Sequence, residues 1–406
     1  MTTESERTYP VVHFDPEDDP EVHQDHWRYF DDLREHGPAF FSPAGDGIWI
    51  LTDRERVSTA LSDTDRFSSA VVSGLKKNRV APAAKLIPVQ LDRPEHTTYR
   101  KLLNPSFTPE AVRDLKDSVR ARCRELVESL AGSRAGGEID FMDDFARVFP
   151  TVIFLDLVGL PVDRATELVQ WSHAISHVTA AEDPTGEIRE AGRANVQQLI
   201  ADCLSEHREN PRDDVIGRLL ESEIDGRPLT DAELHNMITL LYIAGLDTVA
   251  GTLGYIWQYL ATHPDQRARI VAGDTVIPTA VEEFLRYFST VSLTRTVRED
   301  MEFGGCPMKS GDKVWAPIAC ANRDPQVYED ALEVRLDRSP NRHIAFGIGP
   351  HRCVGSHLAR MEVGIALEEW HRVMPDYSLA PDVDLTEKVA GMACFQELRL
   401  SLGAMR

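Results

Sequence analysis

The sequence predicts a mainly α-helical protein with a small β lobe. Residues 109–218 carry almost continuous helical patterns of apolar side chains. A second pattern, at residues 230–263, is long enough for a helix that crosses a whole domain. The clearest strand patterns are short, at residues 47–51 and 291–297. A length of 406 residues fits two or three domains, or one large helical unit with a strand-rich lobe.

Composition limits the possible partners. The net charge is −22 and the hydrophobic content is 42%, so we expect neither nucleic acid nor an anionic membrane as a partner of the whole molecule. The N-terminus lacks the basic and apolar regions of a signal peptide. No uninterrupted apolar run approaches the roughly 20 residues that cross a bilayer. We therefore expect a cytoplasmic protein without a membrane anchor.

The cysteines argue for a reducing compartment. None forms a CxxC pair, and their spacing suggests neither a zinc site nor a disulfide framework. The six are Cys123, Cys203, Cys306, Cys320, Cys353 and Cys394.

The first hundred residues predict alternating short elements. Residues 1–20 are acidic and contain several prolines, so we expect poor order there. Residues 71–91 show weak periodicity and predict a mobile segment. The other expected elements are helices at 24–36, 53–61 and 92–100, and a strand at 47–51.

The long central helix begins with a capping box. Thr230 is the expected N-cap and Glu233 the N3 residue. About 33 residues at ~1.5 Å each give a rod of about 50 Å. Its middle contains Gly245, Asp247 and Thr248 in an otherwise apolar run. All three residue types disfavour helix interiors, so this position calls for a functional explanation or a local kink with a self-bonded threonine.

The next helix starts at Pro278, a residue favoured at the first helical position. It places Glu283 and Arg286 three residues apart on one face. Taken alone, such a pair is a weak signal, because most are surface ion pairs.

A cysteine in a glycine-punctuated loop organises the last third of the chain. Cys353 lies directly before a helical pattern at residues 356–372. The amides and dipole at a helix N-terminus lower the basicity of a thiolate, which is a soft and strongly donating metal ligand. Glycines at 347, 349 and 355 let the backbone approach a planar ligand closely.

These residues resemble a known family. The spacing of Phe346, Gly349, Cys353 and Gly355 is similar to the haem-binding signature of the cytochrome P450 superfamily. The likeness is greatest to soluble, camphor-hydroxylase-like bacterial members. It implies one catalytic unit over residues 1–406, a triangular helical prism around a buried haem b. The expected β-rich lobe comprises mainly residues 40–70 and 290–400, and the helical lobe mainly 95–290 and 353–372.

The resemblance also implies a set of haem contacts. Cys353 would be the proximal iron ligand, whose electron donation favours O–O cleavage. His96, Arg100, Arg295 and His351 would bind the haem propionates through charge-assisted hydrogen bonds. Further haem contacts are implied for Ala244, Phe346, Gly347 and Gly355.

On the other haem face, the resemblance assigns catalysis to Asp247 and Thr248, which would deliver protons. Glu283 and Arg286 would be structural and would join a third residue: Arg323, Arg338 or His343. The implied substrate contacts are Leu240, Ile243, Ala244, Val291, Leu293 and Met392.

The implied reaction is insertion of one atom of O₂ into a small apolar substrate. A terpenoid is favoured, and a steroid, fatty acid or aromatic compound stays open. No GxGxxG motif lies in a βαβ context, so electrons would come from a ferredoxin or flavodoxin with its reductase. Alternatives are a haem-thiolate peroxygenase and a non-catalytic haem sensor or carrier. An acidic redox partner would dock on a basic cluster formed by Lys101, Arg342, Arg352 and Arg360.

Overall fold

The computed structural model describes most of the chain. The described residues are 9–16, 19–70, 85–134, 137–176, 178, 182–273, 275–389 and 391–403. Most of the segment expected to be mobile, 71–91, lies outside these ranges, as does much of the expected disordered segment 1–20.

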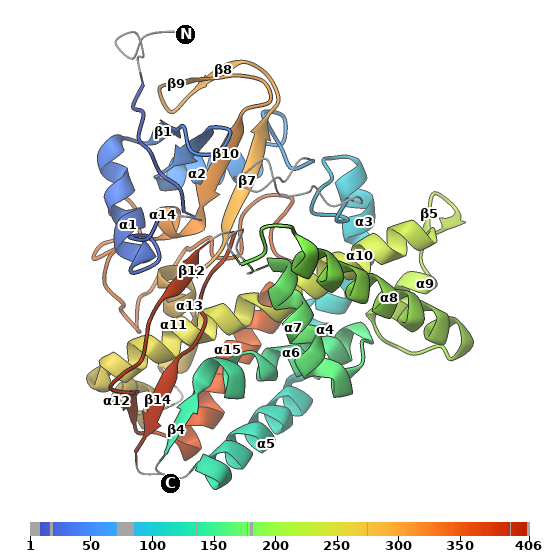
Figure 1. Ribbon diagram of the computed structural model, residues 1–406, viewed down its shortest axis with the longest axis vertical. Coiled ribbons are helices and arrows are strands. Elements are labelled where there is room, and N and C mark those ends of the chain that lie inside the picture. The colour runs from blue at the N-terminus through green and yellow to red at the C-terminus, as the bar shows by residue number, and fades with distance from the viewer. Residues whose placement is uncertain are drawn as a thin grey trace.

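The central rod of the molecule consists of two consecutive helices, α10 (Asp231–Leu246) and α11 (Thr248–Thr262) (Figure 1). The predicted capping box is confirmed: the Glu233 amide donates to Thr230 Oγ1 at 3.3 Å, and the Thr230 amide donates to Glu233 Oε2 at 2.7 Å. The rod was expected to be one helix, but Asp247 interrupts it with φ −102° and ψ −26°.

The interruption has a local physical cause. Thr248 Oγ1 donates to the Ala244 carbonyl at 3.1 Å, and such back-bonding bends helices. A Cβ at Gly245 would lie 2.4 Å from the Phe154 ring, so the glycine lets α10 pack against α6 (Val148–Val158). The break and the Thr248 back-bond of the alternative explanation are therefore present, and they leave the functional explanation open.

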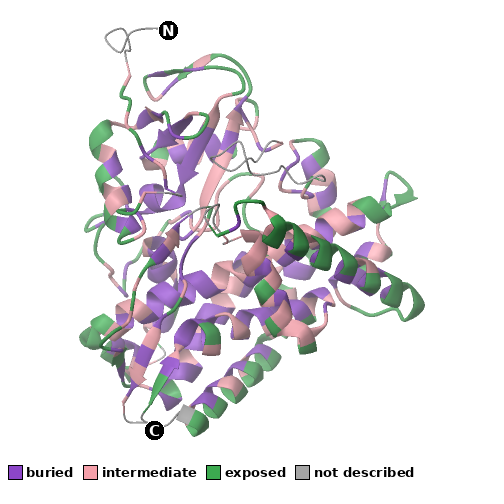
Figure 2. Ribbon diagram, viewed as in Figure 1, coloured by how far each residue is buried: buried purple, intermediate pink, exposed green. Residues whose placement is uncertain are grey.

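Other helices surround this rod. Helix α15 (Ser356–Val373) packs between α13 (Ile277–Tyr287) and α5 (Lys116–Arg134), and α7 (Ala165–Ser176) packs on α8 (Glu187–Glu209). Figure 2 shows buried residues along α11, and exposed outer faces on α5 and α8. The remaining helices are α1 (His26–Asp32), α2 (Arg54–Ser62), α3 (Glu95–Leu103), α4 (Pro109–Asp114), α9 (Val215–Leu220), α12 (Pro264–Ala272) and α14 (Ile318–Asn322), with short turns η2 (Leu33–His36), η3 (Asn104–Phe107), η4 (Met142–Ala146) and η5 (Val162–Arg164).

A five-stranded sheet lies at one end of the molecule, near the N-terminus (Figure 1). Its order is β1-β2-β10-β7-β3, and β10 runs parallel to β2 and antiparallel to β7. These strands are β1 (Ala39–Ser42), β2 (Ile48–Leu51), β3 (Phe67–Ser68), β7 (Ser292–Val297) and β10 (Lys313–Pro317). Both predicted strands are thus present, and they belong to one sheet. Two small hairpins are formed by β8 (Met301–Phe303) with β9 (Cys306–Met308) and by β5 (Glu223–Ile224) with β6 (Arg227–Pro228).

The last strands lie elsewhere. Strands β11 (Tyr377–Leu379), β14 (Arg399–Leu402) and β4 (Glu138–Asp140) form a sheet near the C-terminus, beside the helices and away from the first sheet (Figure 1). The structure differs here from the expectation of one β-rich lobe and of an almost wholly helical 109–218 segment. The reason is that β4 is only three residues long and becomes a strand through pairing with distant β14.

A third pairing, between β12 (Glu387–Val389) and β13 (Ala393–Phe395), forms the C-terminal hairpin. This hairpin packs directly on α11. Residues 231–262 are also long and apolar enough to cross a membrane, but 56% of their most apolar window is buried inside the protein, as in a core helix.

Candidate haem site

The cysteine loop is held in a tight conformation before α15. The Cys353 amide donates to the Phe346 carbonyl at 2.8 Å, which places the two residues side by side. Gly347 and Gly349 have φ values of +70° and +79°. A Cβ at Gly349 would lie 2.8 Å from Cα of Ser62 in α2. Glycine is required here both for the left-handed backbone and for the close contact.

Cys353 is exposed, whereas the other five cysteines are buried. Protein atoms around it still desolvate the sulfur and raise the pKa of its thiol, while the Gly355 amide and three arginines lower it. Those arginines are Arg100, Arg352 and Arg360. An accessible sulfur among cationic groups has the setting of a reactive or metal-binding cysteine.

Two histidines and one charged arginine form a buried polar corner near this loop. The ring centroids of His96 and His351 are 4.1 Å apart. His96 Nδ1 and His351 Nε2 are buried and have no hydrogen-bond partner among the described residues. Arg295 is 5% exposed and donates to the Thr294 carbonyl at 2.8 Å. Within the described ranges, no carboxylate lies within ion-pair distance of Arg295.

The electrostatics of this corner favour an acidic ligand. Desolvation, the largest cause in each case, lowers the pKa of His96 to about 4, of His351 to about 3 and of Arg295 to about 10. Arg100 lowers the pKa of both histidines further, so all four predicted propionate ligands lie in one cluster. A buried guanidinium without a carboxylate partner is stabilised by an anionic ligand, and neutral imidazole N–H groups can donate hydrogen bonds to the same ligand. The residues present therefore fit the carboxylates of a haem.

Arg100 is positioned by its own contacts. Its Nη2 donates to the Arg352 carbonyl at 2.6 Å, and its Nε donates to Asn104 Oδ1 at 2.9 Å. These bonds connect α3 to the residue just before Cys353.

The rod places Asp247 and Thr248 at its break. Ser172 Oγ of α7 donates to Asp247 Oδ2 at 2.7 Å. Ala244 is exposed in the middle of the rod, and Leu240 and Ile243, on the preceding turn, are half-buried. An exposed small residue within a central helix indicates a hollow against this part of α10.

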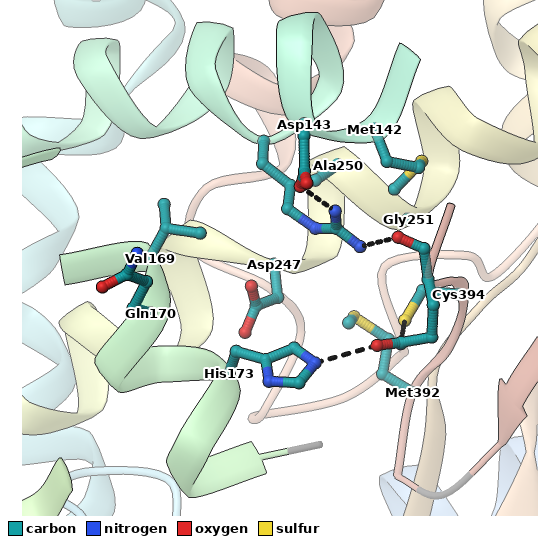
Figure 3. Close-up of a pocket in the computed structure, with 12 residues that line it drawn as sticks. Met142, Asp143, Val169, Gln170, His173, Asp247, Ala250, Gly251, Met392 and Cys394 are labelled. Carbon is teal, nitrogen blue, oxygen red and sulfur yellow. Dashed lines mark hydrogen bonds and ion pairs between the residues drawn. The ribbon is translucent and has the colours of Figure 1, made fainter. Parts of the chain in front are cut away.

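A cavity of about 320 Å³ lies beside Asp247. Figure 3 shows its walls, which come from α7, from η4 with Arg147, from the junction of α10 and α11, and from the C-terminal hairpin. His173 Nε2 lies 2.8 Å from Gln396 Oε1 on one wall. Gly251 and Met392 line the wall nearest the hairpin. The Asp247 carboxylate thus borders a polar hollow and not only packed core.

Two of the predicted substrate contacts are neighbours. Val291 and Met392 form an antiparallel bridge, and the Ser292 amide donates to the Gly391 carbonyl at 3.0 Å. Leu293 lies beside the cysteine loop, because its Cδ1 is 3.9 Å from the position of a Cβ at Gly347. The structure therefore brings the start of strand β7 and the turn of the C-terminal hairpin together.

The Glu283–Arg286 pair is fully buried, with Arg286 Nη2 2.8 Å from Glu283 Oε1. The third member, which the sequence left open, is Arg338: its Nε lies 3.0 Å from Glu283 Oε2. Asn341 Nδ2 also donates to this carboxylate at 3.0 Å.

The other two candidates bind elsewhere. Arg323 pairs with Asp31 at 2.5 Å, and His343 pairs with Glu282 at 2.8 Å. Which residue joins Glu283 and Arg286 therefore depends on tertiary contacts and not on distance along the chain.

Two residues of this region were not foreseen. Asp92 accepts from Ser68 Oγ at 2.5 Å and pairs with Arg298 at 2.6 Å, and its charge partly opposes the lowering of the Arg295 pKa by burial. Asp92 could have been predicted from the sequence as a neighbour of this corner, because it lies four residues before His96. Glu362 of α15 is 2% exposed, its Oε1 has no partner among the described residues, and burial raises its pKa well above the usual range. No sequence signal distinguishes it from a surface glutamate.

The fold and this site together define a class: helical proteins that hold an acidic prosthetic group beside an accessible cysteine. Comparison with known proteins then gives the family. The cytochrome P450 family model matches residues 21–382. The probable cytochrome P450 127A1 of Sinorhizobium fredii is 35% identical over 346 residues, which are 84% of this chain and 81% of that protein. A steroid C26-monooxygenase of Mycolicibacterium smegmatis is 34% identical, with 86% of each chain covered.

Solved structures agree with this assignment. Cytochrome P450 CYP101C1 superposes with a TM-score of 0.88 at 31% identity over 100% of both chains. CYP109E1 from Bacillus megaterium, solved with testosterone, gives 0.85 at 25% identity over 95% of this chain and all of the other. The chain therefore belongs to the cytochrome P450 family: it has the P450 fold, its cofactor is haem b, and it is a monooxygenase. The predicted family, fold class, cofactor and enzyme class are confirmed.

Proposed function

We propose that the protein hydroxylates a small apolar substrate with one atom of O₂ and that Cys353 is the axial ligand of the haem iron. The observation that carries this proposal is the exposed Cys353 beside the buried polar corner of His96, Arg295 and His351. The corner would bind the propionates, and Arg100 would add a second guanidinium beside that of Arg295. The haem supplies the oxygen chemistry, and the chain orients the substrate and controls protons.

Asp247 and Thr248 are the proposed proton-delivery pair. The Thr248 hydroxyl donates to the Ala244 carbonyl, so its oxygen keeps lone pairs free to accept a second hydrogen bond. Asp247 borders the cavity in Figure 3 and can exchange a proton with water there. The break between α10 and α11 supports this role, because it changes the directions in which the Asp247 and Thr248 side chains leave the helix.

The proposed substrate is terpenoid-like, and a steroid, a fatty acid or an aromatic compound is the alternative. The substrate contacts that the resemblance implies are all apolar, which supports a compact apolar molecule. These contacts are Leu240, Ile243, Ala244, Val291, Leu293 and Met392. Likeness to camphor-hydroxylase-like P450s favours a terpenoid, whereas relatives named as a steroid monooxygenase and a methyl-branched lipid omega-hydroxylase support the alternatives.

Electrons are proposed to come from a ferredoxin or flavodoxin with its reductase in the cytoplasm. Bacterial P450s normally use such partner proteins. Lys101, Arg342 and Arg352 are exposed and could receive an acidic partner. Arg360 is a weaker candidate than expected, because it is half-buried and pairs with Glu282 at 2.6 Å.

The docking proposal has a direct test. Lys101→Glu with Arg342→Glu should slow electron transfer from an acidic ferredoxin and flatten its salt dependence. Lys309→Glu, one residue beyond β9, reverses a single charge and is therefore compared with each of the two single variants. Equal effects of Lys309→Glu and of each single variant would place the docking surface elsewhere.

The first experiment is the reduced, CO-bound difference spectrum of the purified protein, with Cys353→His as the control. A strongly red-shifted Soret band that the control lacks is the expected result. A Soret band typical of histidine ligation in folded wild-type protein would overturn the assignment of Cys353.

A second experiment separates the alternatives. Thr248→Ala should divert NADH-driven turnover into peroxide release while the thiolate spectrum persists. Unchanged coupling, together with efficient turnover on added hydrogen peroxide, would favour the peroxygenase. Absence of any substrate-induced spin shift or partner-dependent turnover would favour the haem sensor or carrier.

A further inference from the structure

The C-terminal hairpin rests on an unusually smooth part of α11. A Cβ at Gly251 would lie 3.1 Å from the Ala393 carbonyl oxygen, and one at Gly254 would lie 3.6 Å from the Phe395 ring. Two glycines therefore let the hairpin backbone approach the helix closely. Because glycine has no side chain, this face of α11 offers no ridge that would fix the hairpin along the helix axis.

The turn of the hairpin reaches the proposed substrate pocket. Met392 bridges Val291, and the Ala393 amide donates to the Thr290 carbonyl at 2.9 Å. The sulfur of Met392 lies 4.0 Å from the position of a Cβ at Gly251, three residues after Thr248. A shift of the hairpin along α11 would therefore move Met392 relative to the proton-delivery pair.

The other end of the hairpin is held by the N-terminal segment. Glu387 and His23 exchange two hydrogen bonds, Glu387 N to His23 O at 2.9 Å and His23 Nδ1 to Glu387 O at 2.9 Å. The Glu387 carboxylate also receives the His26 amide at 3.1 Å and lies 2.5 Å from His26 Nδ1. The His26 and Glu387 side chains are 0% and 5% exposed.

This buried hydrogen-bonded pair lies among aromatic rings. The His26 ring is 3.9 Å from Trp27 and 5.5 Å from Tyr255, and Tyr255 is 4.6 Å from Phe395, the cross-strand neighbour of Glu387. A buried pair of this kind adds little net stability compared with apolar side chains of similar volume. The directional hydrogen bonds between His26 and Glu387 instead favour one position of strand β12 relative to α1.

We propose that His26 and Glu387 are positioning residues for the substrate. The pair fixes the C-terminal hairpin along α11, and thereby sets how Met392 lies against Gly251 of the rod. The inference rests on the proposed function, since Met392 is taken as part of the substrate wall. It adds a determinant of specificity that is remote from the haem and lies on the first helix of the chain.

The test compares two azole probes on the full-length, haem-loaded protein. Imidazole reports access to the iron alone, whereas 4-phenylimidazole must also fit against the pocket wall. Both are titrated by difference spectroscopy. In Glu387→Gln, and in the apolar double variant His26→Phe with Glu387→Leu, the ratio of the two dissociation constants should change by about tenfold. The free energy of unfolding of the double variant should stay near that of the wild type.

Lys388→Met is the matched control, because Lys388 is on the same strand and pairs with Glu182 near the surface. It should change the ratio by less than about twofold. An unchanged ratio in Glu387→Gln with an intact thiolate spectrum would overturn the positioning role while leaving the proposed function in place. Loss of the wild-type thiolate spectrum would instead refute the proposed function. If the double variant does not fold, the ratio in Glu387→Gln decides.

Discussion

Arg338 donates through Nε to both carboxylate oxygens of Glu283, at 3.1 Å to Oε1 and 3.0 Å to Oε2, although 55 residues separate the two. The carboxylate is 0% exposed and also binds Arg286. The site therefore joins α13 to the segment that leads into the cysteine loop, and it gives the first of five predictions.

Arg338→Met should leave Glu283 with an incompletely paired buried charge and lower the free energy of unfolding by about 3–5 kcal/mol. Urea denaturation of the haem-loaded protein measures this. Arg335→Met is the control, because Arg335 is 42% exposed in its pair with Asp330, and a change of at most about 1 kcal/mol is expected. Equal losses in both variants would contradict the special role of Arg338.

Gly349→Ala should distort the cysteine loop. The residue has φ +79°, and the new Cβ would approach the backbone of Ser62, which cannot move aside as a side chain could. We expect a loss of about 1–3 kcal/mol and a diminished thiolate Soret band. Gly132→Ala, in α5 with open space around it, should stabilise by up to about 1 kcal/mol. A Gly349 variant with normal stability and spectrum would refute this account.

Arg295→Leu should affect haem-free and haem-loaded protein in opposite directions. Removing a buried guanidinium that lacks a carboxylate partner within the described structure should stabilise the haem-free protein. Losing a propionate ligand should speed haem transfer to apomyoglobin by about tenfold. Slower or unchanged haem release would remove Arg295 from the propionate site.

Glu369 should make stability depend on pH. Burial acts to raise its pKa, but hydrogen bonds from Arg124, Arg120 and Arg372 outweigh this and lower the pKa to about 2. A lowered folded-state pKa gives stability that is complete above pH 4.5 and is lost as the pH falls towards 2. Allowing for solvent around the arginines, Glu369→Gln should cost about 2 kcal/mol at pH 7, less than about half of that at pH 3, and little near pH 2. A loss independent of pH, by urea denaturation, would exclude this linkage.

Glu362 should show the opposite dependence. Burial raises its folded-state pKa, so ionisation opposes folding as the pH rises above 4.5. Glu362→Gln should therefore gain stability relative to the wild type as pH increases, by about 1 kcal/mol or more near pH 8. Glu125→Gln, on the exposed face of α5, should show no such trend in the same urea titrations. A flat difference for Glu362→Gln would mean that its carboxyl is already charged.

Local chemistry explains which features could be predicted. The capping box of Thr230 and Glu233 uses residues three apart, and the turn at Gly349 and the helix after Cys353 depend on neighbours in the sequence. A resemblance carried by a few spaced residues was enough for the family, the fold and the cofactor. Strand β4 was missed because three residues carry too little pattern without the partner that pairs with them.

The sequence by itself determined the helical class, the cysteine loop and the helix that follows it, because these depend on contacts within a few residues. Only the tertiary structure chose Arg338 over Arg323 and His343, and joined His26 to Glu387. Such pairings depend on which side chains meet when distant segments pack together. A buried charge takes whichever partner that packing provides, and no local pattern encodes the choice.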